Sequence, residues 1–238
     1  MTHIRDIYFK VEPGYEGRFL VPTLYDIKQN KIVSNESSEI LRMFYTEFDD
    51  LLPEKYRTPN VDLFPSDLRS QIEETNEWTY NAINNGVYKS GFATTQGAYE
   101  KAVHPLFDAL AKAEAHLQKM APEGPYYYGK HITEADVRLY TTIVRFDPVY
   151  HQHFKCNIAD IRSGFPALHR WLRKLYWDEE AFGSTTEFEH IKNHYTKSHG
   201  QINPTTVTAI GPIPHILKKD QEVAAVKAAL EKEGKRGR

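Results

Sequence analysis

The sequence lacks the features that define several protein classes. It holds a single cysteine, Cys156, among 238 residues, which excludes an internal disulfide and a zinc site made of thiolates alone. No apolar run approaches the ~20 residues of a membrane-spanning helix, and the first residues lack the apolar block of a signal peptide. We therefore expect a cytoplasmic protein with no membrane partner.

Neither sign of charge is in excess. The 30 lysines and arginines nearly balance 32 aspartates and glutamates, which gives a formal net charge of −2. A chain without a large basic surface has little electrostatic attraction for phosphate backbones, so we expect no nucleic-acid partner. The small basic tail KEGKRGR is expected to be a solvated chain end.

The first part of the chain carries a β-type pattern that gives way to a helical one. Residues 19–35, FLVPTLYDIKQNKIVSN, contain two apolar runs joined by a polar turn, which predicts a hairpin. Apolar residues then recur at three- and four-residue spacing, which predicts an amphipathic helix over 37–50. Two prolines and a loss of periodicity indicate a linker over 53–66.

Everything beyond the linker has the pattern of helices. Thr133-x-x-Asp136 is a capping-box variant, and the helix that it opens has few polar faces, so it should be the buried centre of a bundle. The other predicted helices cover about 68–91, 99–120 with a kink at Pro105, 166–175 with proline at its start, 188–195 and 222–231, with an irregular strap over 201–216.

The junction of hairpin and helix, IVSNESSEI, carries a candidate site. A helix that begins near Ser37 leaves its first backbone N–H groups unpaired. Together with the hydroxyls of Ser37 and Ser38, these N–H groups can donate hydrogen bonds to a carboxylate or a phosphate. Glu36 suits an ammonium group beside that anion, so the pair fits an α-amino acid. The alternative is that both serines only cap the helix.

The Val21-Pro22 step suits a second part of this candidate site. A proline that interrupts an apolar β-run belongs at a sheet edge or at a cis peptide bond, because it cannot donate to a ladder. An extended peptide could pair with the free backbone of Val21 by strand addition. Together the two elements predict a site for a short peptide with a free amino-acid head group.

Four stretches of the sequence resemble the glutathionyl-hydroquinone reductases, the Xi class of the omega-like glutathione transferases. The resemblance runs from about His3 to Ile213, and the stretches are VPTLYDIKQNKIVSNESSEI, INNGVYKSGFATTQGAYE, RFDPVYHQHFKCN and IKNHYTKSHGQINPT. It implies an α+β fold that is mostly α. The implied parts are a partial thioredoxin-like domain at 1–52, the linker at 53–66, an all-helical domain at 67–216 and a helical tail at 217–238.

The resemblance also implies the ligand and the site residues. Glutathione would be the co-substrate, held through its cysteinyl backbone by Val21 before a cis Pro22 and through its γ-glutamyl group by Glu36 and Ser37. The remaining residues implied for the site are Tyr88 and Tyr195, near the thiol and the quinone ring. The implied reaction reduces a glutathionyl-hydroquinone to the hydroquinone through a glutathione mixed disulfide, in a homodimer and without a metal.

The sequence departs from the family at one point. Family members carry an early Cys-Pro motif whose cysteine is the nucleophile, and this chain has none, so we expect very weak or absent turnover. Cys156 is expected to be a small structural hydrophobe. Two alternatives stay open: a non-catalytic glutathione-transferase-like binding module, and a fragment of a longer gene product.

Several histidines are candidate metal ligands. His190 and His194 share a helix face, His199 follows nearby, and His151-x-His153 precedes Cys156. No H-E-x-x-H pattern accompanies them. We expect solvated or hydrogen-bonding histidines and no metal site.

Overall fold

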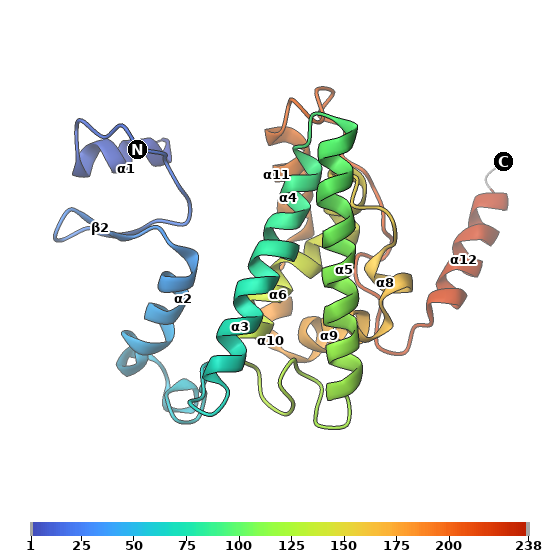
Figure 1. The fold of residues 1–238 in the computed structure, drawn as a ribbon, viewed down its shortest axis with the longest axis horizontal. Helices are drawn as coiled ribbons and strands as arrows, with labels where there is room; N and C mark the ends of the chain where they lie inside the picture. The colour runs from blue at the N-terminus through green and yellow to red at the C-terminus, as the bar shows by residue number, and fades with distance from the viewer. Residues whose placement is uncertain (1, 237–238) are drawn as a thin grey trace. The chain divides into compact units, whose positions relative to one another are not determined.

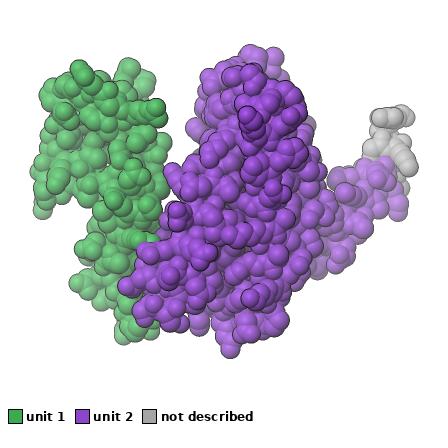
Figure 2. All heavy atoms as spheres, viewed as in Figure 1, with its two compact units in different colours: residues 1–63 green, residues 64–238 purple. Residues whose placement is uncertain are grey.

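A computed structural model describes the backbone of residues 2–236 and the side chains of residues 2–232. The chain divides into two compact units, Met1–Leu63 (unit 1) and Phe64–Arg238 (unit 2), which Figure 2 colours green and purple. Most of the basic tail KEGKRGR lies outside the residues whose side chains are described. No helix within residues 2–236 is both long enough and apolar enough to cross a bilayer.

Unit 1 is a short hairpin flanked by helices. Its elements are α1 (Ile4–Val11), β1 (Leu24–Asp26), β2 (Lys31–Ser34), α2 (Ser37–Thr46) and the 3₁₀ turns η1 (Asp49–Leu51) and η2 (Glu54–Tyr56). The two strands pair antiparallel with Tyr25 opposite Ile32, which confirms the hairpin. Asn30 closes the turn with φ 50°, a left-handed conformation that asparagine tolerates better than most residues.

The elements of unit 1 differ from the predicted ones in three ways. The first strand begins at Leu24 rather than near Phe19, because Pro22 offers no N–H to a ladder. The helix that follows the hairpin ends at Thr46, four residues earlier than predicted. Helix α1 was not predicted at all; the Asp6 carboxylate accepts the backbone N–H groups of Thr2 and His3 at its start.

Unit 2 is a bundle of helices (Figure 1). In chain order it contains α3 (Arg69–Thr79), η3 (Tyr80–Asn84), α4 (Asn85–Gly91), α5 (Gln96–Met120), α6 (Glu134–Arg145), η4 (Phe146–Tyr150), α7 (His151–His153), α8 (Ile161–Gly164), α9 (Pro166–Asp178), α10 (Glu180–Gly183), α11 (Phe188–Ser198) and α12 (Val223–Arg236). The fold is therefore α+β and mostly α, as the sequence predicts.

Helix α6 lies at the centre of unit 2, as its pattern predicted. The predicted capping box forms, because the Asp136 carboxylate accepts the backbone N–H and the hydroxyl of Thr133. The same carboxylate accepts the backbone N–H of Tyr127 at 2.8 Å and the indole N–H of Trp171 at 2.8 Å. One buried carboxylate thus joins α6 to the preceding loop and to α9.

Two features of the long helices could not be anticipated from periodicity. The predicted helix over 68–91 is continuous but contains a π-helical segment, η3, between α3 and α4. A second π-helical segment, η4, joins α6 to α7.

Helix α5 extends unbroken from Gln96 to Met120 with Pro105 inside it. Helix α9 begins at Pro166, as predicted, and the Glu114 carboxylate accepts its first free N–H groups, from Ala167 and Leu168.

Candidate functional site

Three tyrosines in unit 2 form a continuous chain of hydroxyl groups. Tyr88 lies on α4, Tyr195 on α11 and Tyr150 at the end of η4. The Tyr88 and Tyr195 hydroxyls are 2.6 Å apart, and the Tyr195 and Tyr150 hydroxyls are 2.8 Å apart. The structure therefore brings together the two tyrosines predicted from sequence, 107 residues apart in the chain, and adds a third.

Burial increases along this tyrosine chain. Tyr88 is 39% exposed, Tyr195 is 6% exposed and Tyr150 is 2% exposed. Burial raises the pKa of Tyr195, and so does the neighbouring Tyr88. Burial also raises the pKa of Tyr150 well above its usual value. The buried phenols therefore stay neutral and can orient the hydroxyl of Tyr88 toward an acceptor at the surface.

Aromatic rings surround the tyrosine chain. The ring centroid of Phe154 lies 5.2 Å from that of Tyr88, 5.4 Å from that of Tyr150 and 5.8 Å from that of Tyr195. Phe92 lies 6.5 Å from Tyr88 with nearly parallel planes. Such a surface is apolar with one polar group at its edge, which suits a flat ring that carries oxygen substituents.

A pair of histidines lies beside the aromatic rings. His153 Nε2 and His199 Nδ1 are 3.1 Å apart, so one ring donates to the other. Burial, followed by the neighbouring His199, lowers the pKa of His153 to about 4. The imidazoles are hydrogen-bonded to each other, and no group of three or more metal-ligating side chains converges anywhere in the described part of the chain.

Cys156 is enclosed by protein. It is fully buried, and its Sγ lies 3.9 Å from the Val87 carbonyl and 3.8 Å from the Phe154 carbonyl. Burial raises the pKa of its thiol to about 12, which outweighs the opposite effect of the adjacent Lys155. A thiol that stays protonated and enclosed is a poor nucleophile, so its environment favours a structural role.

The residues predicted to bind glutathione lie in unit 1, on two neighbouring segments. The Val21–Pro22 bond is cis, and within residues 2–236 Val21 has no hydrogen-bond partner, so its backbone groups are free for a ligand. Ser37 is the first residue of α2, and Glu36 precedes it as the N-cap without a side-chain capping bond. Both side chains are exposed.

Tyr8 connects these two segments. Its hydroxyl donates to the Leu20 carbonyl at 3.0 Å and accepts the Leu20 N–H at 3.2 Å, next to Val21. It also accepts the side-chain amide of Asn35 at 3.1 Å, next to Glu36. Because Tyr8 is only 2% exposed, this hydroxyl fixes the separation of the two segments from the interior of unit 1.

Sequence reasoning missed Tyr8 and Tyr150. Tyr8 lies in α1, whose sequence IRDIYFKV carries no ligand-binding motif. Tyr150 lies in RFDPVYHQHF, which has the pattern of a helix interior, and only its π-helical backbone turns the side chain toward Tyr195. A buried tyrosine hydroxyl needs a hydrogen-bond partner. This requirement is the one indication in the sequence that Tyr8 and Tyr150 could take part in a site.

A family model described as the C-terminal domain of glutathione S-transferase matches residues 96–174. This match covers α5, α6 and most of α9. It therefore covers the part of the bundle that contains Tyr150, the buried end of the tyrosine chain.

Relatives extend the match over most of the chain. The omega-like 2 glutathione S-transferase of Schizosaccharomyces pombe is 53% identical over 214 residues, which cover 90% of this chain and 67% of the relative. The glutathionyl-hydroquinone reductase YqjG of Escherichia coli is 46% identical over 206 residues, which cover 87% and 60%. This chain thus spans about two thirds of the length of these relatives.

A solved structure agrees with the sequence relatives. The Xi glutathione transferase from Saccharomyces cerevisiae in complex with glutathione is 45% identical, with a TM-score of 0.86 over 91% of this chain and 68% of that one. The similarity therefore extends from sequence to fold.

Proposed function

Because the chain belongs to the Xi-class, omega-like glutathione transferases, we propose that it acts on glutathionyl-hydroquinones. In this proposal the segments around Val21 and Glu36 in unit 1 bind the glutathionyl group. The tyrosine chain of unit 2 binds the hydroquinone or quinone ring. The family relationship also leads us to propose a homodimer, which sedimentation of the purified chain would test.

The geometry of unit 1 supports the glutathione part of this proposal. Within the described residues the Val21 backbone groups are unpaired, which allows main-chain hydrogen bonds to a cysteinyl residue. The free N–H groups at the start of α2 favour the γ-glutamyl carboxylate, and the Glu36 carboxylate favours its ammonium group.

The observation that carries the ring part of the proposal is the chain of hydroxyls from Tyr88 to Tyr150. The phenol hydroxyl at the exposed end can donate to a quinone carbonyl or to a leaving phenolate. The two buried hydroxyls behind it hold that donor in one orientation without reorganisation. An isolated surface tyrosine would have no such support.

The sulfur chemistry sets the expected rate. Removing glutathione from a hydroquinone ring requires a thiolate that attacks the thioether sulfur, so that an S–S bond forms, the C–S bond breaks and the ring carbon takes a proton. Cys156 is the only thiol of this sequence, and burial keeps it protonated. We therefore expect this chain to bind both halves of the substrate and to turn it over very weakly or not at all.

Calorimetric titration with reduced glutathione tests the binding part. We expect saturable binding that Glu36→Ala weakens by about tenfold or more, because a charge-assisted contact is lost. Glu16→Ala, which removes another exposed carboxylate of unit 1, is the matched control and should bind as the original chain does. Absence of binding by a chain with helical circular dichroism would contradict the proposal.

The enclosure of Cys156 favours a second candidate function, a non-catalytic glutathione-transferase-like binding module. A hydroquinone-release assay with glutathionyl-menadiol and reduced glutathione separates the two. Release that is lost in Cys156→Ser would make this thiol the nucleophile and would contradict its structural role. Binding of glutathione without any release would favour the module.

A further inference from the structure

A histidine, His199, shares the aromatic surface of unit 2 with Tyr88. The ring centroid of His199 lies 5.1 Å from that of Phe92 and 5.8 Å from that of Phe154. The same two phenylalanine rings contact Tyr88. Tyr88 and Phe92 are 39% and 37% exposed, and His199 is half-buried. This surface therefore carries two rings with polar atoms, which two phenylalanines connect.

The backbone of His199 is held where α11 ends. Its carbonyl accepts the N–H groups of Ile202 and Asn203, both at 2.9 Å. The side-chain amide of Asn203 in turn donates to the Thr196 carbonyl at 2.9 Å. Because these bonds tie His199 to α11, its imidazole projects from a fixed position of the backbone.

A second, buried histidine holds the ring of His199. His153 is 5% exposed, and its Nε2 lies 3.1 Å from His199 Nδ1. Burial lowers the pKa of His199, as does the neighbouring His194, so both imidazoles of the pair are neutral at pH 7. The bond between them uses Nδ1 of His199. No hydrogen bond within the described part of the chain uses its Nε2, which can therefore contact a ligand.

A neutral imidazole suits both oxidation states of a quinone ring. When His199 accepts from His153 at Nδ1, its Nε2 carries a proton and can donate to a quinone carbonyl. When His199 instead donates from Nδ1, its Nε2 has a lone pair and can accept from a hydroquinone hydroxyl. One side chain can thus contact the ring oxygen before and after a change of oxidation state.

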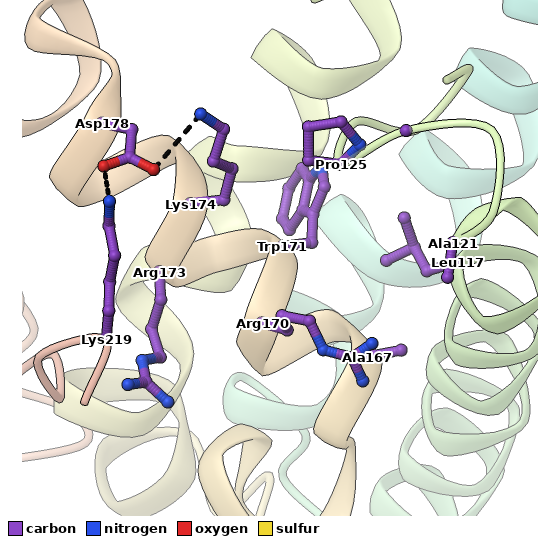
Figure 3. Close-up of a pocket in the computed structure, with 11 residues that line it drawn as sticks. Leu117, Ala121, Pro125, Ala167, Arg170, Trp171, Arg173, Lys174, Asp178 and Lys219 are labelled. Atoms are coloured by element: carbon purple, nitrogen blue, oxygen red, sulfur yellow. Dashed lines mark ion pairs between the residues drawn. The ribbon is translucent and has the colours of Figure 1, made fainter. Parts of the chain in front are cut away.

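The surroundings of the histidine pair carry little charge. The neighbours that act electrostatically on the pair are Lys155, on His153, and His194, on His199. A pocket of about 520 Å³ along α9 differs, because it is lined by charged side chains such as Lys174 and Asp178, which pair at 3.2 Å (Figure 3). An uncharged ring with oxygen substituents is therefore better suited to the aromatic surface than to the pocket along α9.

We propose that His199 makes a second hydrogen bond to the bound ring and thereby selects rings with two oxygens in para positions. Tyr88 contacts one oxygen and His199 Nε2 contacts the other, since oxygens at opposite ends of a six-membered ring suit polar groups that are connected by phenylalanine rings. His153 is a positioning residue that holds the imidazole of His199. This inference rests on the proposed binding of a hydroquinone or quinone ring at Tyr88.

NMR titration of the complete chain with 4-methoxyphenol and 4-ethylphenol tests the role of His199. The two probes have similar shapes and one hydroxyl each, but only the first has an oxygen in the para substituent. We expect the original chain to bind 4-methoxyphenol about fivefold more tightly, because one hydrogen bond is added. His199→Phe should bind both probes equally. His104→Phe makes the same change at an exposed position of α5 and should keep the preference.

Variants of His153 test its positioning role. We expect His153→Phe to lose most of the preference for 4-methoxyphenol, whereas His153→Gln should keep it, because the glutamine amide can still donate to His199 Nδ1. Nitrogen NMR spectra of the imidazoles give a second measurement: 4-methoxyphenol should shift the Nε2 resonance of His199, and 4-ethylphenol should not. If His153→Phe changes only the stability of the chain, the positioning role is wrong.

Tyr88→Phe separates this inference from the proposed function. If Tyr88→Phe weakens the binding of both probes but His199→Phe keeps the preference of the original chain, the ring site stands and the role of His199 is overturned. Absence of saturable binding of either probe would contradict the ring site, and this inference with it. Affinities that neither variant changes would place the probes elsewhere, for example in the pocket along α9, and would also overturn the inference.

Discussion

The Tyr8 hydroxyl donates one hydrogen bond and accepts two within unit 1. It bonds both backbone groups of Leu20 and the side chain of Asn35, and it lies 3.3 Å from the Thr23 hydroxyl. A buried tyrosine is ordinarily explained by the packing of its ring. Here the hydroxyl determines the positions of the two segments proposed to bind glutathione, so its removal should affect binding as well as stability.

Tyr8→Phe tests this coupling. We expect the variant to lose about 1–3 kcal/mol of unit 1 stability, since buried backbone groups lose their partner, and to bind glutathione about tenfold more weakly. Tyr15→Phe is the matched control, because the Tyr15 hydroxyl makes one exposed hydrogen bond, to the Arg18 carbonyl. Calorimetric titration measures both variants, and equal affinities in the two would contradict a positioning role for Tyr8.

Cys156 gives a second prediction for a single residue. A thiol pKa of about 12 leaves roughly one thiol in 10,000 ionised at pH 8, and the residue is fully buried. We expect the folded chain to be inert to 5,5′-dithiobis(2-nitrobenzoate) at pH 8 and to release one equivalent of thionitrobenzoate in 6 M guanidinium chloride. Rapid labelling of the folded chain would show that this thiol is accessible.

The predictability of site residues depended on whether a local pattern existed. The helix start at Ser37 and the cis bond at Pro22 were predictable, because both follow from local sequence patterns; the binding roles of Glu36 and Ser37 stay predictions. Tyr88 and Tyr195 could be named only through the resemblance, since nothing local indicates that their hydroxyls meet. Tyr150 escaped both approaches, because a π-helical turn has no sequence pattern of its own.

At the scale of helices, apolar periodicity predicted the long elements and failed for the short ones. Helices α5, α6, α9 and α11 each present enough turns for an apolar stripe to recur. The short helices α8 and α10 have four residues each, which is about one turn and too little for a period. Their positions are determined by tertiary contacts such as that of Asp147, whose carboxylate accepts the N–H of Ile161 at 2.6 Å.

The end of α4 packs directly on an aromatic ring of the candidate site. Gly91 is buried there, and a Cβ added to it would overlap the ring of Phe154. We expect Gly91→Ala to destabilise unit 2 by about 1–3 kcal/mol, because Phe154 would have to leave its position. Loss of the ring arrangement should also weaken any quinone binding at Tyr88.

Gly97→Ala is the matched control for that prediction. Gly97 lies in the first turn of α5, and an added Cβ would meet nothing within 4 Å. The variant should be more stable by about 0.5–1 kcal/mol, since alanine is the better helix former. Urea unfolding followed by circular dichroism measures both variants. A Gly91→Ala chain as stable as the original would show that Phe154 has room to move.

At the scale of the whole chain, burial is concentrated in unit 2. Among the described residues, the buried hydrophobic side chains of unit 1 are Tyr8 and Ile40, whereas unit 2 holds a continuous core of aromatic and aliphatic residues. The stability of the chain therefore depends mainly on unit 2. It also depends on the protonation states of the titratable side chains buried in that unit.

Two buried histidines make that stability depend on pH. Burial lowers the pKa of His153 to about 4, as does the neighbouring His199. Burial, followed by Arg173 and Arg162, lowers the pKa of His169 to about 4. The unfolded chain takes up these protons near pH 6.5, so their contribution to stability is complete above pH 6.5 and is lost as the pH falls from 6.5 toward 4.

The original chain should therefore lose about 2–3 kcal/mol more stability between pH 7.5 and pH 5.5 than the variant His153→Gln/His169→Gln. The comparison with the variant matters because Asp136 and Asp147 have raised pKa values from burial and titrate with the opposite effect on stability. That contribution is common to both chains and cancels. Urea midpoints at the two pH values measure the difference, and parallel losses in the two chains would contradict the prediction.

The two π-helical segments also bear on how this chain can vary by insertion and deletion. A π-helical turn holds one more residue than an α-helical turn, and one residue corresponds to about 100° of rotation along a helix. Deleting a residue from Phe146–Tyr150 would thus restore a regular α-helix and rotate Tyr150 away from Tyr195. We therefore expect insertions and deletions within Phe146–Tyr150 only in related proteins that lack the hydrogen-bonded tyrosines. Surface loops, in contrast, can accept insertions and deletions freely.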